Sequence, residues 1–341
     1  MTQKILQGDN LIDFLTEYGI FLAKGVTLVL LFLLAFGGML RLYTRKKSVR
    51  DEHLEVKKLN EKYQRMSLVL KAATLSKKAF KQELKALKVQ HKQNRKPSTD
   101  NERKRVYVLK FKGDVRASAV ASLRESITAI LTVAKPLDEI VVLLESSGGT
   151  VHEYGLAASQ LRRIGSKGVK LTVAVDKVAA SGGYMMACVA DRIIAAPFAI
   201  IGSIGVIGQL PNFNRLLKKI DIDFEQITAG EYKRTLNLFG ENTENGRAKA
   251  QEEIKDTHRL FKEFVVENRP KMDIETIATG EHWYGKRALT LNLVDELCTS
   301  DDYLCAAALQ ADVYEVSYIR RKGFLERLLS STPSLLSSVH F

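Results

Sequence analysis

Cysteine and proline are scarce in this chain of 341 residues, which has three cysteines and six prolines. The cysteines, Cys188, Cys298 and Cys305, are odd in number and fall at no regular spacing. They therefore offer neither a disulfide framework nor a C-x-x-C metal site. We expect three free, partly buried thiols and a fold held together by its apolar core, since 45% of the residues are hydrophobic.

Acidic residues are few in one region only. Residues 41–106 hold 21 Lys/Arg against 7 Asp/Glu, a balance of +14, so the rest of the chain sums to −1 of the total +13. Nucleic-acid binding is the usual interpretation of a basic chain. Because this segment directly follows an apolar run, contact with anionic lipid headgroups is a simpler explanation, and a solvated spacer is the alternative. We expect no nucleic-acid partner.

The apolar run itself, residues 18–40, has a single charged side chain, Lys24. At about 1.5 Å per residue it can cross a hydrocarbon core of ~30 Å, and Lys24 can reach the interface. No small-x-small cleavage site follows, so we predict an uncleaved transmembrane anchor and not a signal peptide. Basic residues crowd into 41–50, and such residues stay cytoplasmic. The predicted orientation has the N-terminus outside and the remainder of the chain in the cytoplasm.

The chain divides into five predicted parts. The linker is expected to be a charged helical stalk, because residues 44–96 contain neither proline nor glycine. The parts are a short N-terminal segment (1–17), the transmembrane anchor (18–40), a basic, helical linker (41–104), a folded domain (105–320) and a C-terminal tail (321–341).

Short apolar runs rich in β-branched residues alternate with helical patterns from residue 105 onwards. The alternation indicates an α/β fold with a parallel or mixed sheet and helices outside it. In such folds the loops at the carboxyl ends of strands carry the chemistry. The predicted strands are 106–111, 139–146 and 170–176, and the predicted helices are 117–131, 152–165, 243–269 and two within 274–297.

Two of these strand-end loops are rich in serine and glycine, ESSGGTV (145–151) and DKVAASGGY (176–184). In the second, Ser181 stands at a tight turn before a helix-forming stretch. A serine is a poor nucleophile until a base removes its proton. Lys233, in GEYKRTLN, is the basic partner that the pattern offers, and a lysine acts as a base where burial lowers its pKa. The pattern predicts a serine hydrolase with a Ser-Lys pair.

The glycines of the two loops are candidates for an oxyanion site. Glycine lets a backbone N–H face a substrate without a Cβ in the way. Two such groups can hold the oxygen of a tetrahedral intermediate, and losing one donor typically costs about 10²–10³ in rate. We expect one donor from Gly148 or Gly149, a choice that the sequence leaves open, and the other from Gly182.

Simpler interpretations exist for each residue. Taken alone, Ser181 is better explained as an N-cap, and each Ser-Gly-Gly as an ordinary tight turn; two such loops at successive strand ends favour function. The serine also lacks the G-x-S-x-G elbow of α/β-hydrolases. His152 lies near a candidate loop but has no evident acid to orient it, so the sequence disfavours a His-based triad.

Four motifs, taken in order, resemble those of peptidase family S49, the signal peptide peptidase A group. They are ESSGGTV, DKVAASGGYMMACVADRIIA, PFAIIGSIGVIG and AGEYKRTLN. The resemblance covers most of the chain from about residue 105, together with the anchor. It implies a ClpP/crotonase-like α/β spiral fold, with Ser181 as nucleophile, Lys233 as general base and Ser203 as the serine that orients the lysine. Ser147 departs from the family's usual S-P-G-G, which removes some rigidity but no chemical group.

The resemblance further implies a membrane-anchored serine endopeptidase of the bacterial inner membrane. It would hydrolyse signal peptides, membrane-derived peptides or misfolded proteins through an acyl-enzyme, with no metal or cofactor. Members form homo-oligomers in which serine and lysine can meet across a subunit boundary. Activity should rise with pH as Lys233 loses its proton. An acyl-CoA enzyme of the crotonase type and an inactive membrane scaffold of the same fold are the alternatives, and the intact Ser181 and Lys233 argue against both.

Overall fold

The computed structural model describes residues 5–48, 52–94 and 103–320. The chain forms two units, one of Met1–His53 with Ile319–Phe341 and one of Leu54–Tyr318. The predicted tail (321–341) lies outside the described residues.

The first unit contains helix α1 (Ile5–Ser48) of 44 residues. Its segment Glu17–Met39 has a mean hydropathy of 2.3, and none of it is buried by the rest of the described structure. In the part of the chain that the structure describes, it is the one helix long and apolar enough to cross a membrane. It coincides closely with the apolar run of the sequence.

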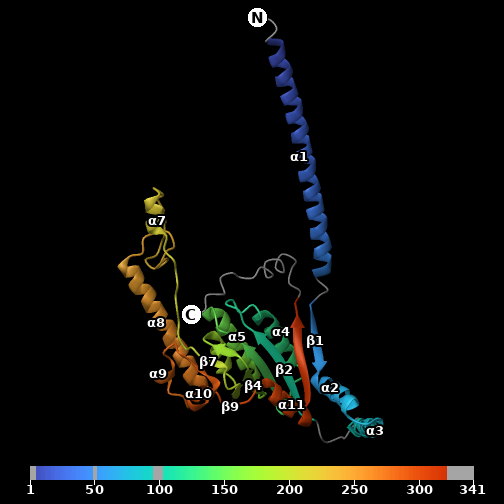
Figure 1. The fold of residues 1–341 in the computed structure, drawn as a ribbon. Helices are drawn as coiled ribbons and strands as arrows, with labels where there is room; N and C mark the ends of the chain where they lie inside the picture. Colours follow the sequence, from blue (N-terminus) through green and yellow to red (C-terminus); the bar gives the residue numbers. More distant parts are fainter. Residues whose placement is uncertain (1–4, 49–51, 95–102, 321–341) are drawn as a thin grey trace. The chain divides into compact units, whose positions relative to one another are not determined.

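The strands of the second unit form two sheets (Figure 1). The strands are β1 (His53–Lys58), β2 (Arg105–Lys112), β3 (Glu139–Glu145), β4 (Lys170–Val175), β5 (Val178–Ala180), β6 (Arg192–Ala195), β7 (Ile200–Gly202), β8 (His282–Tyr284), β9 (Glu296–Leu297) and β10 (Asp312–Ile319). One sheet has seven strands in the order β1-β10-β2-β3-β4-β6-β9, with parallel pairing from β10 to β9. The other has three, β5-β7-β8. β5 and β7 are parallel, and β7 and β8 are antiparallel.

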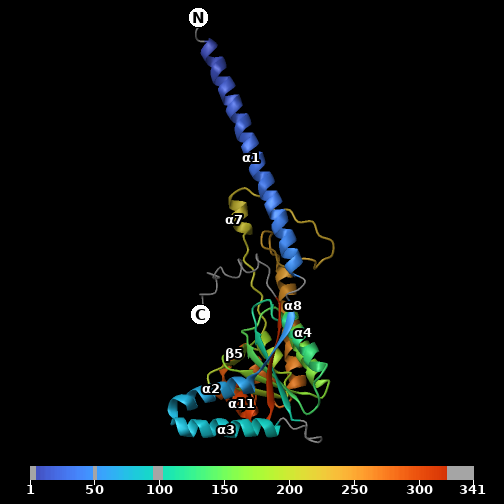
Figure 2. The same ribbon diagram turned by 90° about the vertical axis from the view of Figure 1, so that its right-hand side faces the viewer.

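Helices cover both faces of the larger sheet. The helices of this unit are α2 (Leu59–Thr74), α3 (Lys77–Asn94), α4 (Val120–Leu131), α5 (Val151–Gly165), α6 (Gly182–Ala187), α7 (Asn214–Lys219), α8 (Glu244–Asn268), α9 (Ile274–Ile277), α10 (Gly285–Thr290) and α11 (Ser300–Gln310), of which α4 and α5 line one core and α2 and α11 the other. Figure 2 shows α2 beside α11.

Alternate residues of the inner strand β2 enter different cores, since successive side chains of a strand point to opposite faces. Leu109 and Phe111 pack in a large cluster with apolar residues of α4 and α5. Val106 and Val108 pack in a smaller cluster with Leu304 of α11 and with α2. Burial on both faces explains why the predicted strands are continuous apolar runs and not alternating patterns.

The two sheets take strands from the chain in turn: β4 and β6 join the large sheet, whereas β5 and β7 join the small one. The repeated switching winds the chain into the predicted α/β spiral, with an antiparallel pair in the small sheet. The predicted strands at 106–111, 139–146 and 170–176 are all present as β2, β3 and β4.

The segment 41–104, expected as a helical stalk, also contains the strand β1, which forms one edge of the large sheet. β1 leads directly into α2, whose first residue Leu59 is buried in the smaller core. The long-range partner β10 stabilises this strand, and so local helix propensity does not decide the structure of residues 53–58.

Candidate active site

The loop after β3 lies beside the strand that leads to Ser181. The Ser146 N–H donates to the Val178 carbonyl at 2.9 Å, and the Ala180 N–H donates to the Ser146 carbonyl at 3.0 Å. These bonds form an isolated parallel bridge between Ser146 and Ala179. The two Ser-Gly-Gly loops are therefore neighbours, as expected for adjacent strand ends in such a sheet.

Ser181 occupies a strained turn between β5 and α6. Its φ of 52° and ψ of −120° lie in a region that residues with a Cβ rarely adopt. Such a conformation costs roughly 1–3 kcal/mol and persists where the surroundings enforce it. Here the Ser181 N–H donates to the Gly202 carbonyl at 2.7 Å, and the Ser181 carbonyl accepts the Met185 N–H at 3.0 Å. Although Ser181 stands at the N-cap position, its side chain makes no capping hydrogen bond, so simple capping does not account for it.

Gly148 lies directly against the serine. It has a φ of 93°, and a Cβ there would come within 2.7 Å of both the Ser181 Cβ and the Gly182 nitrogen. A side chain at position 148 is therefore excluded on both conformational and steric grounds. Gly149, the other candidate, faces the Val115 carbonyl instead, because a Cβ there would lie 2.1 Å from that oxygen. The structure thus places Ser181, Gly148 and Gly182 together.

Ser203 is also brought beside Ser181. Ala180 and Gly202 are paired residues of the parallel strands β5 and β7, so the two serines follow matched positions. Ser203 likewise has a positive φ, 51°, and its N–H donates to the Glu281 carbonyl at 2.7 Å. Both serines are half-buried, at the ends of two neighbouring strands.

Lys233 lies elsewhere in the single chain. It is exposed, in the segment 206–243 between β7 and α8, drawn in yellow in Figure 1 and called the arm below. Among the described residues, no hydrogen bond or ion pair joins Lys233 to Ser181 or Ser203. The Lys233 N–H donates to the Gly230 carbonyl at 3.2 Å.

The arm exposes many large apolar side chains. It is tied together by backbone and ring contacts, such as the Phe213 N–H donating to the Leu238 carbonyl at 2.7 Å and the Phe224 and Phe239 rings 5.8 Å apart. Its exposed apolar side chains are Ile207, Leu210, Phe213, Leu216, Ile220, Ile222, Phe224, Ile227, Tyr232, Leu238 and Phe239. Exposed apolar side chains in such number are typical of surfaces that contact another molecule.

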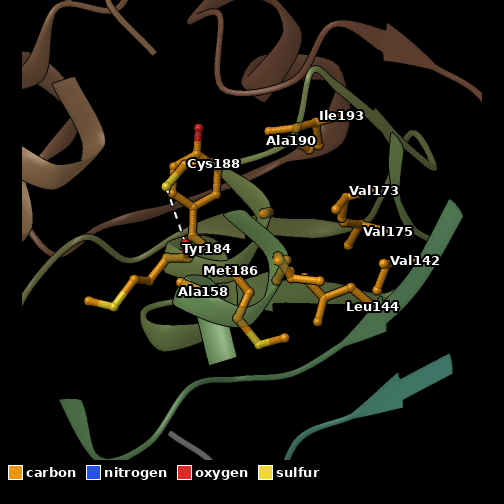
Figure 3. Close-up of a cluster of buried hydrophobic side chains, with 14 of the residues drawn as sticks. Val142, Leu144, Ala158, Val173, Val175, Tyr184, Met186, Cys188, Ala190 and Ile193 are labelled. Atoms are coloured by element: carbon orange, nitrogen blue, oxygen red, sulfur yellow. Dashed lines mark hydrogen bonds between the residues drawn. The ribbon is translucent and has the colours of Figure 1, made fainter. Parts of the chain in front are cut away.

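The remaining candidates have structural explanations. The His152 side chain is 80% exposed and lies 3.9 Å from Glu153, with no contact to Ser181 in the described structure. Tyr184, Met185 and Met186, which follow the Ser181 loop, are buried in the large core, where Tyr184 and Met186 appear in Figure 3 with Cys188. Burial raises the pKa of Cys188 to about 12, so this thiol is unreactive.

A buried tyrosine supports the loop that carries Gly148, and the sequence analysis did not predict it. The Ser146 Oγ lies 2.6 Å from the Tyr154 Oη, which donates to the Asp114 carbonyl at 2.8 Å. The Gly148 N–H donates to the Ser146 Oγ at 3.1 Å. Tyr154 lies on the apolar face of α5, with Ala157, Ala158 and Leu161. The sequence did offer one signal for this contact. Tyr154 falls on the core-facing stripe of a predicted helix, and a buried tyrosine hydroxyl needs a hydrogen-bond partner.

Metal binding finds no support in these side chains: within the described residues, no group of three or more His, Cys, Asp or Glu could hold an ion.

Comparison with known proteins adds the following. The family models "Peptidase family S49 N-terminal" and "Peptidase family S49" match residues 13–161 and 163–314. "Probable protease SohB" of Haemophilus influenzae is 50% identical over 325 residues, 92% of each chain. "Probable protease SohB" of Buchnera aphidicola subsp. Acyrthosiphon pisum is 58% identical over 237 residues, 70% of each chain. Among solved structures, the 1510-N membrane-bound stomatin-specific protease, in complex with a substrate peptide, matches with a TM-score of 0.44 and 12% identity, covering 67% of this chain and 98% of its own.

Proposed function

The chain belongs to peptidase family S49 and is a serine peptidase, and on this premise we propose that it cleaves peptide bonds with Ser181 as nucleophile and Lys233 as general base. The observation that carries the proposal is the setting of Ser181. Ser181 stands in a strained turn, and its side chain makes no capping hydrogen bond. Gly148 and Gly182 lie against it, and Ser203 follows the neighbouring strand β7. Each of these features serves a nucleophile, and none is needed by an ordinary turn.

The proposed reaction proceeds through an acyl-enzyme. Ser181 Oγ attacks the substrate carbonyl while the Lys233 amine accepts the serine proton. The N–H groups of Gly182 and Gly148 hold the negatively charged oxygen, and we choose Gly148 because it lies against Ser181 whereas Gly149 faces Val115. The lysine then protonates the departing amine and activates the water that releases the acyl group. Ser203 would orient the lysine from the end of β7.

A second copy of the chain would complete this site. A lysine serves as a base only in its neutral form, which an exposed amine rarely adopts near neutral pH. Since Lys233 is exposed in the single chain, it needs to be covered, and it lies on the arm with its large apolar surface. Packing of the arm against a neighbouring subunit would bury both Lys233 and the apolar side chains of the arm. This supports a homo-oligomer in which the lysine of one subunit approaches the serine of the next.

The apolar segment of α1 would anchor the enzyme in the bacterial inner membrane. The basic residues that follow it favour a cytoplasmic location for the peptidase domain. In that compartment, membrane-derived peptides and misfolded proteins are the substrates to test first, followed by signal peptides.

The first test compares the full-length chain in detergent with the variants Ser181→Ala and Lys233→Ala on a panel of fluorogenic peptides. We expect each variant to lose about 10⁴-fold or more in kcat while remaining folded and assembled. The matched control is Lys218→Ala, an exposed lysine of the same arm paired with Glu241. Near-normal turnover in Lys233→Ala would overturn the dyad. A folded but inactive wild-type chain that no serine-directed probe labels would instead favour the scaffold alternative.

Mixing the two inactive variants tests where the lysine comes from. If serine and lysine meet across a boundary, mixed oligomers of Ser181→Ala and Lys233→Ala subunits contain some intact sites and recover a fraction of the wild-type rate. If both come from one chain, the mixture stays inactive. Subunit exchange is checked with differently tagged chains.

A further inference from the structure

The buried hydroxyl of Tyr154 joins segments that follow two different strands. Its ring is completely buried, and the hydroxyl contacts Ser146 after β3 and the carbonyl of Asp114 after β2. It belongs neither to the proposed dyad nor to the proposed oxyanion donors. Nor does core packing require it, because a phenylalanine would fill the same space.

The hydrogen bonds around it have one consistent direction. The single Tyr154 proton goes to the Asp114 carbonyl, so at the 2.6 Å contact the Ser146 hydroxyl must donate to Tyr154. The Ser146 Oγ in turn accepts the Gly148 N–H at 3.1 Å. The relay therefore runs from the Gly148 N–H through two hydroxyls to a backbone carbonyl. Burial raises the pKa of Tyr154, so the hydroxyl keeps its proton across the working pH range.

The ring of the same residue supports the second donor. A Cβ on Gly182 would come within 2.4 Å of the Tyr154 Cγ, so the backbone of Gly182 rests directly on the ring. The ring is itself held edge-on by Phe111, with centroids 6.5 Å apart. One side chain thus contacts Gly182 with its ring and, through Ser146, orients Gly148 with its hydroxyl.

We infer that Tyr154 is a positioning residue that fixes the two oxyanion donors, Gly148 and Gly182, relative to each other through its ring and its hydrogen-bond relay. This inference rests on the proposed function. Preorganised donors stabilise a transition state because they need not reorient as charge develops. The Gly148 N–H donates to Ser146 at 3.1 Å, the long end of the usual range, so it can be shared with an arriving substrate oxygen while the relay holds the loop in place.

The test is Tyr154→Phe in the full-length chain, which removes only the hydroxyl. We expect kcat to fall about tenfold while KM changes less than twofold and the shape of the pH profile stays the same. Labelling by a fluorophosphonate probe, which also develops charge on an oxygen, should slow by a similar factor. Ser146→Ala should give a comparable loss, and the double variant should lose little more than either single one, since both changes interrupt one relay.

Tyr303→Phe is the matched control. It also removes a hydrogen-bonded tyrosine hydroxyl, that of the half-buried Tyr303, which donates to Glu139 at 2.5 Å at the opposite end of β3. It should leave kcat unchanged. An equal loss in Tyr303→Phe, an unchanged kcat in Tyr154→Phe, or additive effects of Tyr154→Phe and Ser146→Ala would each overturn the positioning role while leaving the peptidase intact.

Hydrogen exchange separates this inference from the proposed function. The amides of residues 146–150 should exchange faster in Tyr154→Phe than in the wild type, whereas Tyr303→Phe should leave them unchanged. An inactive wild-type chain would overturn the peptidase proposal, and unchanged exchange in Tyr154→Phe would overturn the relay whether or not turnover is detected.

Discussion

Asp138 has one of the most strongly bonded carboxylates in the second unit. It is 3% exposed and accepts bonds from the Arg105 backbone at 3.0 Å, from the Arg105 guanidinium at 2.6 Å and from the Lys135 N–H at 2.8 Å. Burial alone would raise the pKa of this carboxyl, but the bonds from Arg105 and Lys135 outweigh burial and hold the pKa below its usual 3.8. The ionised form is therefore part of the folded structure.

Acid should unfold the protein partly through this residue. Because the folded pKa lies below the unfolded one, the stabilisation is complete above the unfolded value of 3.8 and is lost as the pH falls through the folded value. Asp138→Asn should cost about 2 kcal/mol at pH 7 and less at a pH below 3.8, because the wild type loses this stabilisation as the pH falls through the folded pKa. Thermal melts followed by circular dichroism at both pH values measure this. Glu253→Gln, at an exposed acid of α8, is the control. An equal difference between Asp138→Asn and wild type at both pH values would contradict the prediction.

At the scale of elements, the side chain of Asn60 joins helix α2 to the sheet through hydrogen bonds. The Asn60 Nδ2 donates to the carbonyls of Ala308 and Ala311, both at 2.9 Å, and its Oδ1 accepts the Val313 N–H at 2.7 Å. These bonds join the start of α2 to the end of α11 and the start of β10. Three partners from a segment about 250 positions away in the chain make Asn60 a tertiary clamp.

Asn60→Ala should lower the free energy of unfolding by about 2 kcal/mol, since it leaves three backbone groups without their partner. The matched control is Asn245→Ala, which changes the second residue of α8, an exposed position. Chemical unfolding of both variants in detergent measures the difference. A loss of equal size in the two variants would indicate an effect shared by any asparagine near a helix start and would contradict the clamp.

The sequence predicted the elements that carry a strong local signal. β2, β3 and β4 are continuous β-branched runs, and α5 and α8 have clear apolar stripes. The three-residue strands β5, β7 and β8 were missed, because so short a segment has no period and exists through its pairing. β1 was missed for the related reason that its partner, β10, lies at the other end of the chain.

Sequence prediction succeeded for some residues of the candidate site and failed for others, for the same physical reasons. Ser181, Gly148, Gly182 and Ser203 follow strand ends, and the sheet brings them together. The relay through Tyr154 connects segments after β2 and β3, and no local pattern encodes a bond between them. Lys233 could be named from its motif but not positioned, since the motif carries no information on where the arm holds it.

At the scale of the whole molecule, chemical labelling of a native cysteine can show on which side of the membrane the peptidase domain lies. Cys305 is exposed, Cys298 is half-buried and Cys188 is buried. In the variant Cys298→Ser, a membrane-impermeant maleimide should therefore modify Cys305 alone. If the domain is cytoplasmic, labelling should occur in inverted membrane vesicles and not in spheroplasts. Cys305→Ser, which should abolish labelling, is the control. The opposite pattern would reverse the proposed orientation.

The backbone of Ser181 also bears on the evolutionary history of this chain. A glycine at this position would relieve the unfavourable φ and leave a more stable protein. Selection for folding alone would therefore not retain the serine. A lineage that kept only a scaffold would have had no reason to retain the more costly residue. The proposed role as nucleophile gives a reason for a serine at a position where the backbone angles alone would favour glycine.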